Sequence, residues 1–371
     1  MPETAVRELG EQVVLNFGPQ HPAAHGVLRL IVTLHGEIID DLKPDIGYLH
    51  RGFEKFGEAR TYAQFLPYAD RLDYVSSITC GHAFVEAVER LAQIEVPERA
   101  QFIRVILAEL QRIASHFIFL ATFANDLAAT TVFLYGFRER ELLVDLFEDY
   151  CGQRLTYHAF RIGGVPYDLP AGFARKTREV LKTLRVRLDE NDRLLTGNRI
   201  FRARTEGVGV ISARDAIAWG CSGPTLRGSG VDMDVRRAAP YSVYDRLDFD
   251  VAVERSCDVL GRYLVRVEEM RQSMRIVEQA LDLLPAGPLM AKMPRALKPA
   301  PGEARGRVES SRGDLSVYLI SEGGEMPCRL RIHAPSFGNL QALPIMSRGQ
   351  KIGDLVAIIG SIDLVLGDVD R

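Results

Sequence analysis

Two histidines lie in a short stretch rich in glycine and proline, "GPQHPAAHG", which spans residues 18–26. Glycine frees the backbone and proline fixes it, so the stretch predicts a sharply shaped loop that carries His21 and His25. An imidazole gains or loses a proton near neutral pH, so this loop could form a proton-linked site. The alternative is that both rings only hydrogen-bond the loop. A helical metal pair is disfavoured, because Pro22 follows His21 and the glutamate of an H-E-x-x-H motif is missing.

A carboxylate and a set of phenols are the next candidates. Asp126 interrupts the apolar run "FIFLATFANDLAATTVFLY" at residues 117–135, which imitates a membrane span. An aspartate at the centre of a bilayer costs about 2.5–3.5 kcal/mol, so we expect a core helix with Asp126 buried among apolar neighbours, either capped or part of a functional site. The run "RTYAQFLPYADRLDYVSS" holds Tyr62, Tyr68 and Tyr74. Such tyrosines either pack with the polar end satisfied or offer a phenol to a ligand.

The elements that position these residues follow from hydrophobic patterning, which predicts an α+β chain that is mainly α. Partial alternation around the glycine-proline loop predicts an N-terminal β region at residues 1–52, with the loop at its tip. A helical core domain is expected at residues 53–285. It is followed by a proline-rich irregular segment at 286–306 and a C-terminal α+β region at 307–371. Within that last region, the tripeptide that begins at Arg312 is expected to form a turn between strands.

Three long helices are expected in the core domain. The first begins after Pro97, the second ends with a C-cap at Gly197-Asn198, and the third runs from about Arg255 to Pro285. Their apolar faces could form the core of a helical bundle. The apolar positions at helical spacing are Ile103, Ile106, Leu110, Ile113, Phe117 and Leu120 in the first helix, Val180, Leu181, Leu184, Leu188 and Leu195 in the second, and Leu260, Tyr263, Val267, Met270, Met274, Val277, Leu281 and Leu284 in the third.

Composition excludes several classes of function. The 371 residues are 47% hydrophobic and 26% charged with a formal net charge of −3, which is typical of a globular protein and gives no sign of nucleic-acid binding. The five cysteines form no C-x-x-C pair, which argues for a reducing compartment and against a cysteine-ligated metal or cluster in this chain. No phosphate-binding glycine motif follows a strand. The start of the chain lacks the apolar segment of a signal peptide, so a cytoplasmic location is expected.

An ordered set of segments resembles one family, the D subunit of the proton-pumping NADH–quinone oxidoreductase of respiration, complex I. The segments are "LNFGPQHPAAHGVLRL", "GYLHRGFEK", "RTYAQFLPYADRLDYVSS", "NDLAATTVF", "FRIGGVPYDLP", "LRGSG", "PYSVYD", "RYLVRVEEMRQS" and "DLVAIIGSIDLVLGDVDR". They cover nearly the whole chain. The resemblance implies the fold of the nickel–iron hydrogenase large subunit, with a helical bundle core, an N-terminal β-sheet, a C-terminal α/β piece and no active-site cysteines.

The resemblance also implies roles for four residues. His25 of the loop and Tyr74 of "RLDY" would hydrogen-bond the headgroup of a quinone. Asp126 of "NDL" would be the partner of His25, and Arg51 of "LHRG" would lie near the terminal iron–sulfur cluster of a partner subunit. A positioned imidazole and phenol suit this chemistry, because quinone reduction takes up two electrons and two protons.

The partners and cofactors implied by the resemblance lie mostly outside this chain. The substrate would be ubiquinone or menaquinone, whereas NAD and the iron–sulfur clusters would be bound by partner subunits and no cofactor by this chain alone. The expected partners are the other complex I subunits, especially the cluster-bearing subunit and the membrane subunit at the quinone entrance. The chain would lie peripherally on the cytoplasmic side of the cell membrane.

Alternatives remain at this point. Related quinone oxidoreductases take electrons from ferredoxin or a deazaflavin rather than from NADH. A hydrogenase large subunit would need four cysteine ligands, and the corresponding regions, "RLDYVSSITC" and "GDVDR", do not supply them. A purely structural subunit is the third alternative, against which His25, Tyr74 and Asp126 argue. One departure from the family concerns a cluster-adjacent histidine: "GQRLTYHAF" has Thr156 at its aligned position and His158 two residues later.

Overall fold

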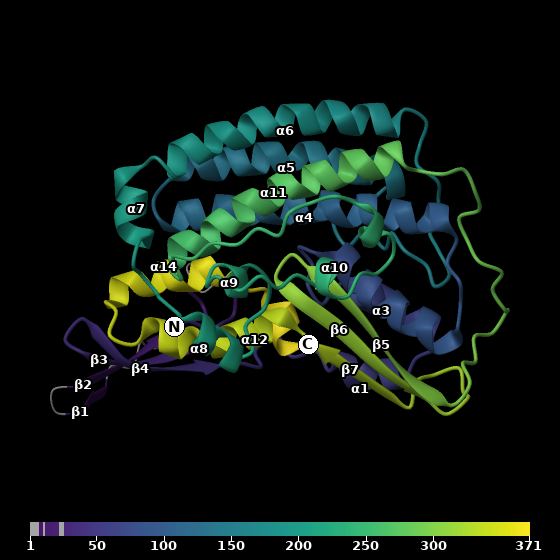
Figure 1. The fold of residues 1–371 in the computed structure, drawn as a ribbon. Coiled ribbons are helices and arrows are strands. Elements are labelled where there is room, and N and C mark those ends of the chain that lie inside the picture. The colour runs from purple at the N-terminus through teal and green to yellow at the C-terminus, as the bar shows by residue number, and fades with distance from the viewer. Residues whose placement is uncertain (1–6, 10–11, 22–25) are drawn as a thin grey trace.

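The computed structural model describes residues 7–9, 12–21 and 26–371, and Figure 1 shows how their helices and strands are arranged. The strands are β1 (Arg7–Leu9), β2 (Gln12–Phe17), β3 (Arg29–His35), β4 (Ile38–Asp45), β5 (Gly302–Ser310), β6 (Gly313–Ser321) and β7 (Arg329–His333). The helices of the first half are α1 (Phe53–Glu58), α2 (Tyr62–Ala69), α3 (Ser77–Ala92), α4 (Glu98–Asp126) and α5 (Thr130–Cys151). They are followed by α6 (Phe173–Leu195), α7 (Arg199–Thr205), α8 (Ala213–Ala218), α9 (Gly223–Arg227), α10 (Val235–Ala238), η2 (Tyr244–Arg246), α11 (Val259–Asp282), α12 (Pro335–Gln341), α13 (Leu343–Ser347), α14 (Ile352–Ile362) and α15 (Leu366–Asp370).

The N-terminal strands form an antiparallel sheet in the order β1-β2-β3-β4. Phe17 at the end of β2 pairs with Leu30 near the start of β3, so the glycine-proline stretch forms the connection between these two strands, as predicted. Along β3 the side chains of Leu30, Val32 and Leu34 are buried and alternate with less buried neighbours, which is the period of a strand with one covered face. The sheet therefore holds the loop at one of its ends.

Long helices make up a second layer, in which α4, α5, α6 and α11 run side by side (Figure 1). The three predicted helices correspond to α4, α6 and α11, and the predicted apolar positions are buried apart from Leu284, which is partly buried and lies beyond the end of α11. One boundary is different from the prediction. Asn198 does not end α6 but caps the start of α7, where its side chain accepts hydrogen bonds from the backbone N–H groups of Ile200 and Phe201.

Helix α4 is the central helix of this layer. Its length and composition would allow it to cross a membrane, but 89% of its most apolar window is buried inside the protein. It packs against α5 and α11, so its apolar surface is covered by other helices of the same chain, as expected for a core helix. Asp126 is the last residue of α4 and is only half-buried, which corrects the expectation of a fully buried carboxylate.

The second sheet has the order β5-β6-β7 and is covered by α3. Strand β5 begins at Gly302, inside the segment expected to be irregular, and the predicted turn between strands is formed by Ser311 and Arg312. A glycine is required at position 306, because a Cβ there would lie 2.3 Å from the backbone oxygen of Ala83 in α3. The glycine therefore lets strand and helix approach closely.

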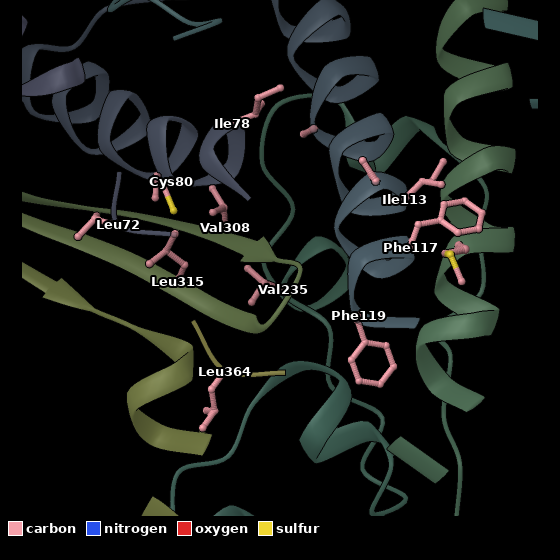
Figure 2. Close-up of a cluster of buried hydrophobic side chains, with 14 of the residues drawn as sticks. Leu72, Ile78, Cys80, Ile113, Phe117, Phe119, Val235, Val308, Leu315 and Leu364 are labelled. Atoms are coloured by element: carbon pink, nitrogen blue, oxygen red, sulfur yellow. The ribbon is translucent and has the colours of Figure 1, made fainter. Parts of the chain in front are cut away.

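The hydrophobic core lies where these layers meet (Figure 2). It includes Ile78 and Cys80 of α3, Ile113 and Phe117 of α4, and Val308 of β5, all of them 2% exposed or less. Helices α13 and α14 connect the N-terminal sheet to the helical layer, because α13 packs against β4 and α14 packs against α4 and α11. The structure is mixed α+β and mainly helical, which confirms the predicted fold class.

Candidate functional site

Segments from both ends of the chain meet around the residue pair Leu366-Gly367. A Cβ placed on Gly26, at the end of the glycine-proline loop, would lie 3.2 Å from Cδ1 of Leu366. A Cβ placed on Gly367 would lie 2.6 Å from the backbone oxygen of Leu72 and 2.7 Å from Nη2 of Arg51. The end of the histidine loop, the Arg51 turn, the segment that leads to Tyr74 and the C-terminal segment are therefore neighbours. A glycine at position 367 makes this close approach possible.

Arg51 is held in place by main-chain groups of these segments. Its Nη2 donates hydrogen bonds to the backbone oxygens of Arg71 at 2.8 Å and Gly367 at 3.2 Å. Its guanidinium group stacks over the ring of Phe53, 4.4 Å from the centroid. Burial lowers the pKa of Arg51, while the negative charge of Asp370 and the nearby Tyr74 oppose this shift. The side chain therefore presents a positioned positive charge close to Tyr74.

The turn that carries Arg51 is tied to the last residues of the chain. The two carboxylate oxygens of Asp370 accept hydrogen bonds from the backbone N–H groups of Gly47 and Leu49, at 2.9 and 2.7 Å. The N–H of Arg51 itself donates to the backbone oxygen of Arg371 at 3.1 Å. The position of Arg51 consequently depends on the C-terminal segment.

Tyr74 follows the buried residues Leu72 and Asp73 and is itself half-buried. Burial raises the pKa of its phenol, and the carboxylate of Asp73 raises it further, while Arg312 and Arg51 lower it. The phenol is therefore protonated at neutral pH and can donate a hydrogen bond or a proton. The structure brings Tyr74 and Arg51 into one electrostatic environment.

Asp126 lies beside α14. A Cβ placed on Gly360 of this helix would be 3.5 Å from Oδ2 of Asp126. Helix α14 ends at Ile362, and the chain then leads directly to Leu366. Asp126 therefore contacts the helix that leads into the C-terminal segment of the site.

His25 lies outside the described residues, so its predicted role stays a prediction. The loop that contains it is described at both ends: His21 is exposed and its ring lies 4.1 Å from the ring of Phe17, and His21 pairs with Gly26 in an antiparallel bridge. Because Gly26 lies against Leu366, the chain enters and leaves this loop close to the site.

His158, which follows the aligned position Thr156 by two residues, lies in a turn that contacts Asp70 at the end of α2. Its backbone is left-handed, with φ of 46°, and its N–H donates a 2.6 Å hydrogen bond to Oδ2 of Asp70. Burial and the positive charges of Arg161 and Arg71 lower the pKa of the imidazole to about 4. Burial raises the pKa of the Asp70 carboxyl to about 7, although the hydrogen bond from His158 opposes the rise. Of these two hydrogen-bonded residues, Asp70 is therefore the one that titrates near neutral pH, whereas His158 stays neutral there.

Asp70→Asn is expected to change how the free energy of unfolding depends on pH. The carboxyl of Asp70 has a higher pKa in the folded chain than in the unfolded chain, so its contribution to stability is present at low pH and is lost as pH rises through about 7. Between pH 5 and pH 8 the wild type should lose about 2 kcal/mol that the variant does not lose.

Urea unfolding of the full chain at both pH values measures this difference. Asp282→Asn is the control, because the side chain of Asp282 is 69% exposed and an exposed ion pair contributes little to stability. The same difference in stability between Asp70→Asn and wild type at pH 5 and pH 8 would contradict the prediction.

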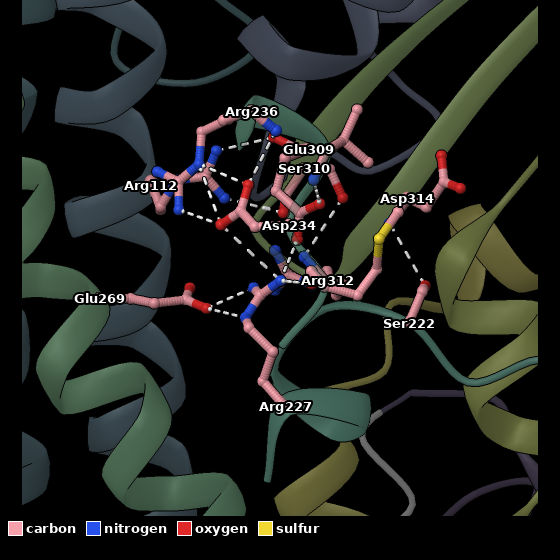
Figure 3. A network of polar contacts seen from close by, with 12 residues as sticks. Arg112, Ser222, Arg227, Asp234, Arg236, Glu269, Glu309, Ser310, Arg312 and Asp314 are labelled. Carbon is pink, nitrogen blue, oxygen red and sulfur yellow. Dashed lines mark hydrogen bonds and ion pairs between the residues drawn. The ribbon is translucent and has the colours of Figure 1, made fainter. Parts of the chain in front are cut away.

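A larger group of buried charges, which sequence reasoning missed, lies between the helical layer and the second sheet (Figure 3). Its members come from α4, α9, α10, α11, β5 and the residue before α10: Glu109, Arg112, Arg227, Asp234, Arg236, Glu269 and Glu309. Arg227 forms an ion pair with Glu269, and its Nη1 donates to Oε1 of Glu309 at 2.8 Å. Opposite charges in contact offset the cost of burying each of them. No short sequence motif reveals such pairs, because the partners lie far apart in the chain.

Sequence reasoning also missed the charged residues behind Tyr74. Arg312 is 1% exposed and contacts Asp73 and Asp363, although it belongs to a turn between strands. The sequence did contain one sign of these charges: aspartates interrupt the apolar segment "IDLVLGDVD" at residues 362–370, which indicates buried carboxylates that need partners. In residues 12–21 and 26–371 no group of three or more His, Cys, Asp or Glu side chains is arranged to hold a metal ion.

Comparison with known proteins identifies relatives over the full length. A profile of the family described as "Respiratory-chain NADH dehydrogenase, 49 Kd subunit" matches residues 126–299 and 292–371. The chain is 50% identical to the D subunit of the NADH-quinone oxidoreductase of Clostridium beijerinckii, over 97% of this chain and 98% of that protein. It is 52% identical to the D subunit of a Dehalococcoides mccartyi strain, over 97% of this chain and 99% of the relative. It is also 49% identical to the D subunit numbered 2 of Solibacter usitatus, over the whole of both chains. The chain therefore belongs to the family of the 49 kDa subunit of respiratory-chain NADH dehydrogenase, which is the D subunit of complex I, and is an oxidoreductase subunit.

Proposed function

We propose that this chain forms, with an adjacent subunit that bears the terminal iron–sulfur cluster, the cavity in which a quinone is reduced to quinol, and that this reduction is coupled to proton translocation. The observation that supports the proposal is the meeting of Arg51, the segment that leads to Tyr74 and the end of the His25 loop around Leu366 and Gly367. A phenol and an imidazole can donate protons to a quinone, and a positive charge stabilises the negative charge that develops as the quinone is reduced.

The chemistry divides between this chain and its partners. The partners supply two electrons, and each of the two quinone oxygens takes up one proton. Tyr74 would donate a hydrogen bond and then a proton to one oxygen as negative charge develops there, and His25 would do the same for the other, with Asp126 as the partner of the imidazole. Arg51, whose charge is held against two backbone oxygens, would face the cluster-bearing subunit and raise the potential of its cluster.

The proposed setting is the cytoplasmic face of the cell membrane, where the chain is peripheral and held by other complex I subunits, including the membrane subunit at the quinone entrance. NAD and the iron–sulfur clusters belong to partners in this scheme, and the quinone is ubiquinone or menaquinone. The names of the relatives favour NADH as the electron source over ferredoxin or a deazaflavin.

Isolation of the chain from membranes tests the proposal. A tag is best placed at the N-terminus, because Asp370 and Arg371 contact the Arg51 turn. The tagged chain is expected to retain a cluster-bearing subunit and membrane subunits after purification in mild detergent. Deletion of the gene should abolish NADH-dependent quinone reduction in membrane vesicles together with the proton uptake that accompanies it, and the tagged gene should restore both.

Two outcomes would reject the proposal. One is recovery of the whole population as a monomer without membrane partners. The other is a deletion strain whose NADH–quinone reductase activity is unchanged. If reduced ferredoxin or a reduced deazaflavin, but not NADH, drives quinone reduction in membranes that carry the tagged chain, the alternative electron source is supported. The proposed quinone site is then kept.

A further inference from the structure

Behind Tyr74, three buried carboxylates converge around one arginine. Asp73 precedes Tyr74 in the chain, Asp363 follows α14 and Asp368 lies in α15, and they are 2%, 7% and 1% exposed. Arg312, at 1% exposure, reaches them from the turn between β5 and β6. We refer to Asp73, Asp363 and Asp368 as the carboxylate triad.

The hydrogen bonds of Arg312 satisfy only part of the triad. Its Nη1 lies 3.1 Å from Oδ2 of Asp73 and donates to the hydroxyl of Ser115 at 2.7 Å. Its Nη2 donates to Oδ1 of Asp363 at 3.2 Å. Asp368 accepts instead from the backbone N–H of Ser336 at 3.0 Å. One arginine therefore serves two of the three carboxylates directly.

One oxygen of each triad carboxylate is buried and has no hydrogen bond of good geometry from the described part of the chain, although two of these oxygens lie within ion-pair distance of an arginine. These atoms are Oδ2 of Asp73, Oδ2 of Asp363 and Oδ1 of Asp368, and all three are buried. The nearest further cation is Arg266, whose Nε lies 3.8 Å from Oδ2 of Asp363. Oδ1 of Asp368 has no such ion pair, and an ionised carboxylate oxygen that is buried without a donor is costly, whereas a protonated carboxyl can itself donate a hydrogen bond. The arrangement therefore favours a proton on the triad.

Burial and the mutual repulsion of the carboxylates also favour a proton on the triad, while the nearby arginines oppose it. Burial raises the pKa of Asp73 to about 6, against the opposing charge of Arg312, and the negative charges of Asp368 and Asp363 add to the rise. Burial likewise raises the pKa of Asp368. The other charged or titratable groups that face the triad are Arg266 of α11, Arg371, Tyr74 and the Cys80 thiol of α3, whose pKa is raised by burial so that it stays neutral. Carboxylates that share one site cannot all ionise at the same pH.

We propose that the carboxylate triad holds one proton near neutral pH, on Asp73 or Asp368, and returns it to Tyr74 after the phenol has given its own proton to the reduced quinone. This inference rests on the proposed function. In the transfer, the O–H bond of one triad carboxyl breaks, the phenolate of Tyr74 becomes a phenol again, and the triad gains one negative charge. A proton from solvent then refills the triad before the next turnover. Asp73 is the member next to Tyr74, and its charge already raises the pKa of the phenol.

The variant Asp368→Asn tests this role. It removes one negative charge from the triad while keeping the shape of the side chain, so the pKa of Asp73 should fall by roughly one unit. The triad then loses its proton at a lower pH. The test uses membranes that carry the assembled complex and measures kcat for quinone reduction as a function of pH. The alkaline limb of this profile should move down by roughly one pH unit. The kcat of the variant should therefore fall up to roughly tenfold at pH 8 and change little at pH 5.5.

Asp314→Asn is the matched control, because Asp314 lies on the same hairpin but pairs with Arg307 outside the triad. Its profile should coincide with that of the wild type, and Asp368→Glu, which restores the carboxyl, should recover most of the shift. A variant profile that coincides with wild type, in a complex in which Tyr74→Phe still impairs quinone reduction, would overturn the triad but not the proposed function. If Tyr74→Phe has no effect, the proposed function fails first.

A second measurement does not depend on turnover. Infrared spectra of the full chain between pH 5 and pH 8 report protonated carboxyl groups through their C=O stretch. Asp70 and Glu309, whose pKa values burial raises to about 7, contribute equally to wild type and variant and cancel in the difference. We expect Asp368→Asn to remove part of the titrating band and shift the remainder to lower pH. An unchanged band would contradict the inference even if the variant fails to assemble.

Discussion

Replacing Tyr74 by phenylalanine is expected to lower quinone reduction by roughly 10²–10³-fold, the loss seen when one donor to a developing oxyanion is removed. The change deletes only the hydroxyl and leaves the half-buried ring in place. Each membrane preparation is assayed twice, once with a quinone and once with an artificial acceptor that takes electrons upstream. Upstream electron transfer and assembly should be unaffected.

The two kinetic constants separate what the phenol does. A fall in kcat means that the hydrogen bond strengthens as the quinone is reduced, whereas a rise in KM alone means that the phenol binds the ground state equally well. Tyr68→Phe is the matched control: Tyr68 lies on α2, is 37% exposed and packs its ring 4.5 Å from that of Phe56. Full quinone reductase activity in Tyr74→Phe would show that the headgroup binds elsewhere.

His25→Ala is expected to have a larger effect than Tyr74→Phe in the same assay. His25 lies outside the described residues, and the expectation rests on its proposed partnership with Asp126. Removing the imidazole takes away one hydrogen-bond partner of the quinone and leaves the half-buried carboxylate without its proposed partner. Wild-type activity in this variant would exclude the loop from the site.

Arg227→Met should destabilise the folded chain by about 3–5 kcal/mol, the largest effect on stability that we expect from a single substitution here. Arg227 is fully buried and pairs with Glu269 and Glu309, with Asp234 also 3.8 Å away. The methionine fills much of the volume but leaves these carboxylates facing one another without their central cation. Denaturant unfolding of the full chain measures the loss.

An exposed ion pair provides the control. Arg185 pairs with Glu278 on the surface of α6 and α11, with a side chain that is 45% exposed. Arg185→Met should cost less than about 1 kcal/mol, since exposed pairs contribute little. If both variants unfold at the same denaturant concentration, the buried group is not a stability element, and its role has to be sought elsewhere.

Hydrophobic periodicity predicted the long helices because burial of one face is a local, repeating requirement. Helices α4, α6 and α11 follow it closely, and the expected buried positions of α4 are buried. Helix boundaries are harder to predict from the sequence. Asn198 suits either the end of one helix or the start of the next, and in the structure its side chain caps the start of α7. Asp126 was expected to be buried because it interrupts an apolar run, but it is the last residue of α4 and is only half-buried.

The site was predicted only in part from the sequence. Arg51 and Tyr74 were singled out through resemblance, and the structure places them in one electrostatic environment. The triad around Arg312 was not predicted, because a buried arginine in a tight turn has no local signature. Its carboxylate partners come from segments before and after it in the chain, and only the fold brings them together.

The contact between Gly26 and Leu366 has a consequence for the order of folding. Contacts within and between successive helices such as α4 and α5 close short loops and can form early. The contact of Gly26 with Leu366, and that of Arg51 with Gly367, joins nearly opposite ends of the chain and carries a larger entropy cost of loop closure. The helical layer can thus be complete while the site is still open. Conversely, local detachment of α15 would take the candidate site apart without unfolding the helical layer, so the lifetime of the site depends on the stability of this short helix rather than on that of the long ones.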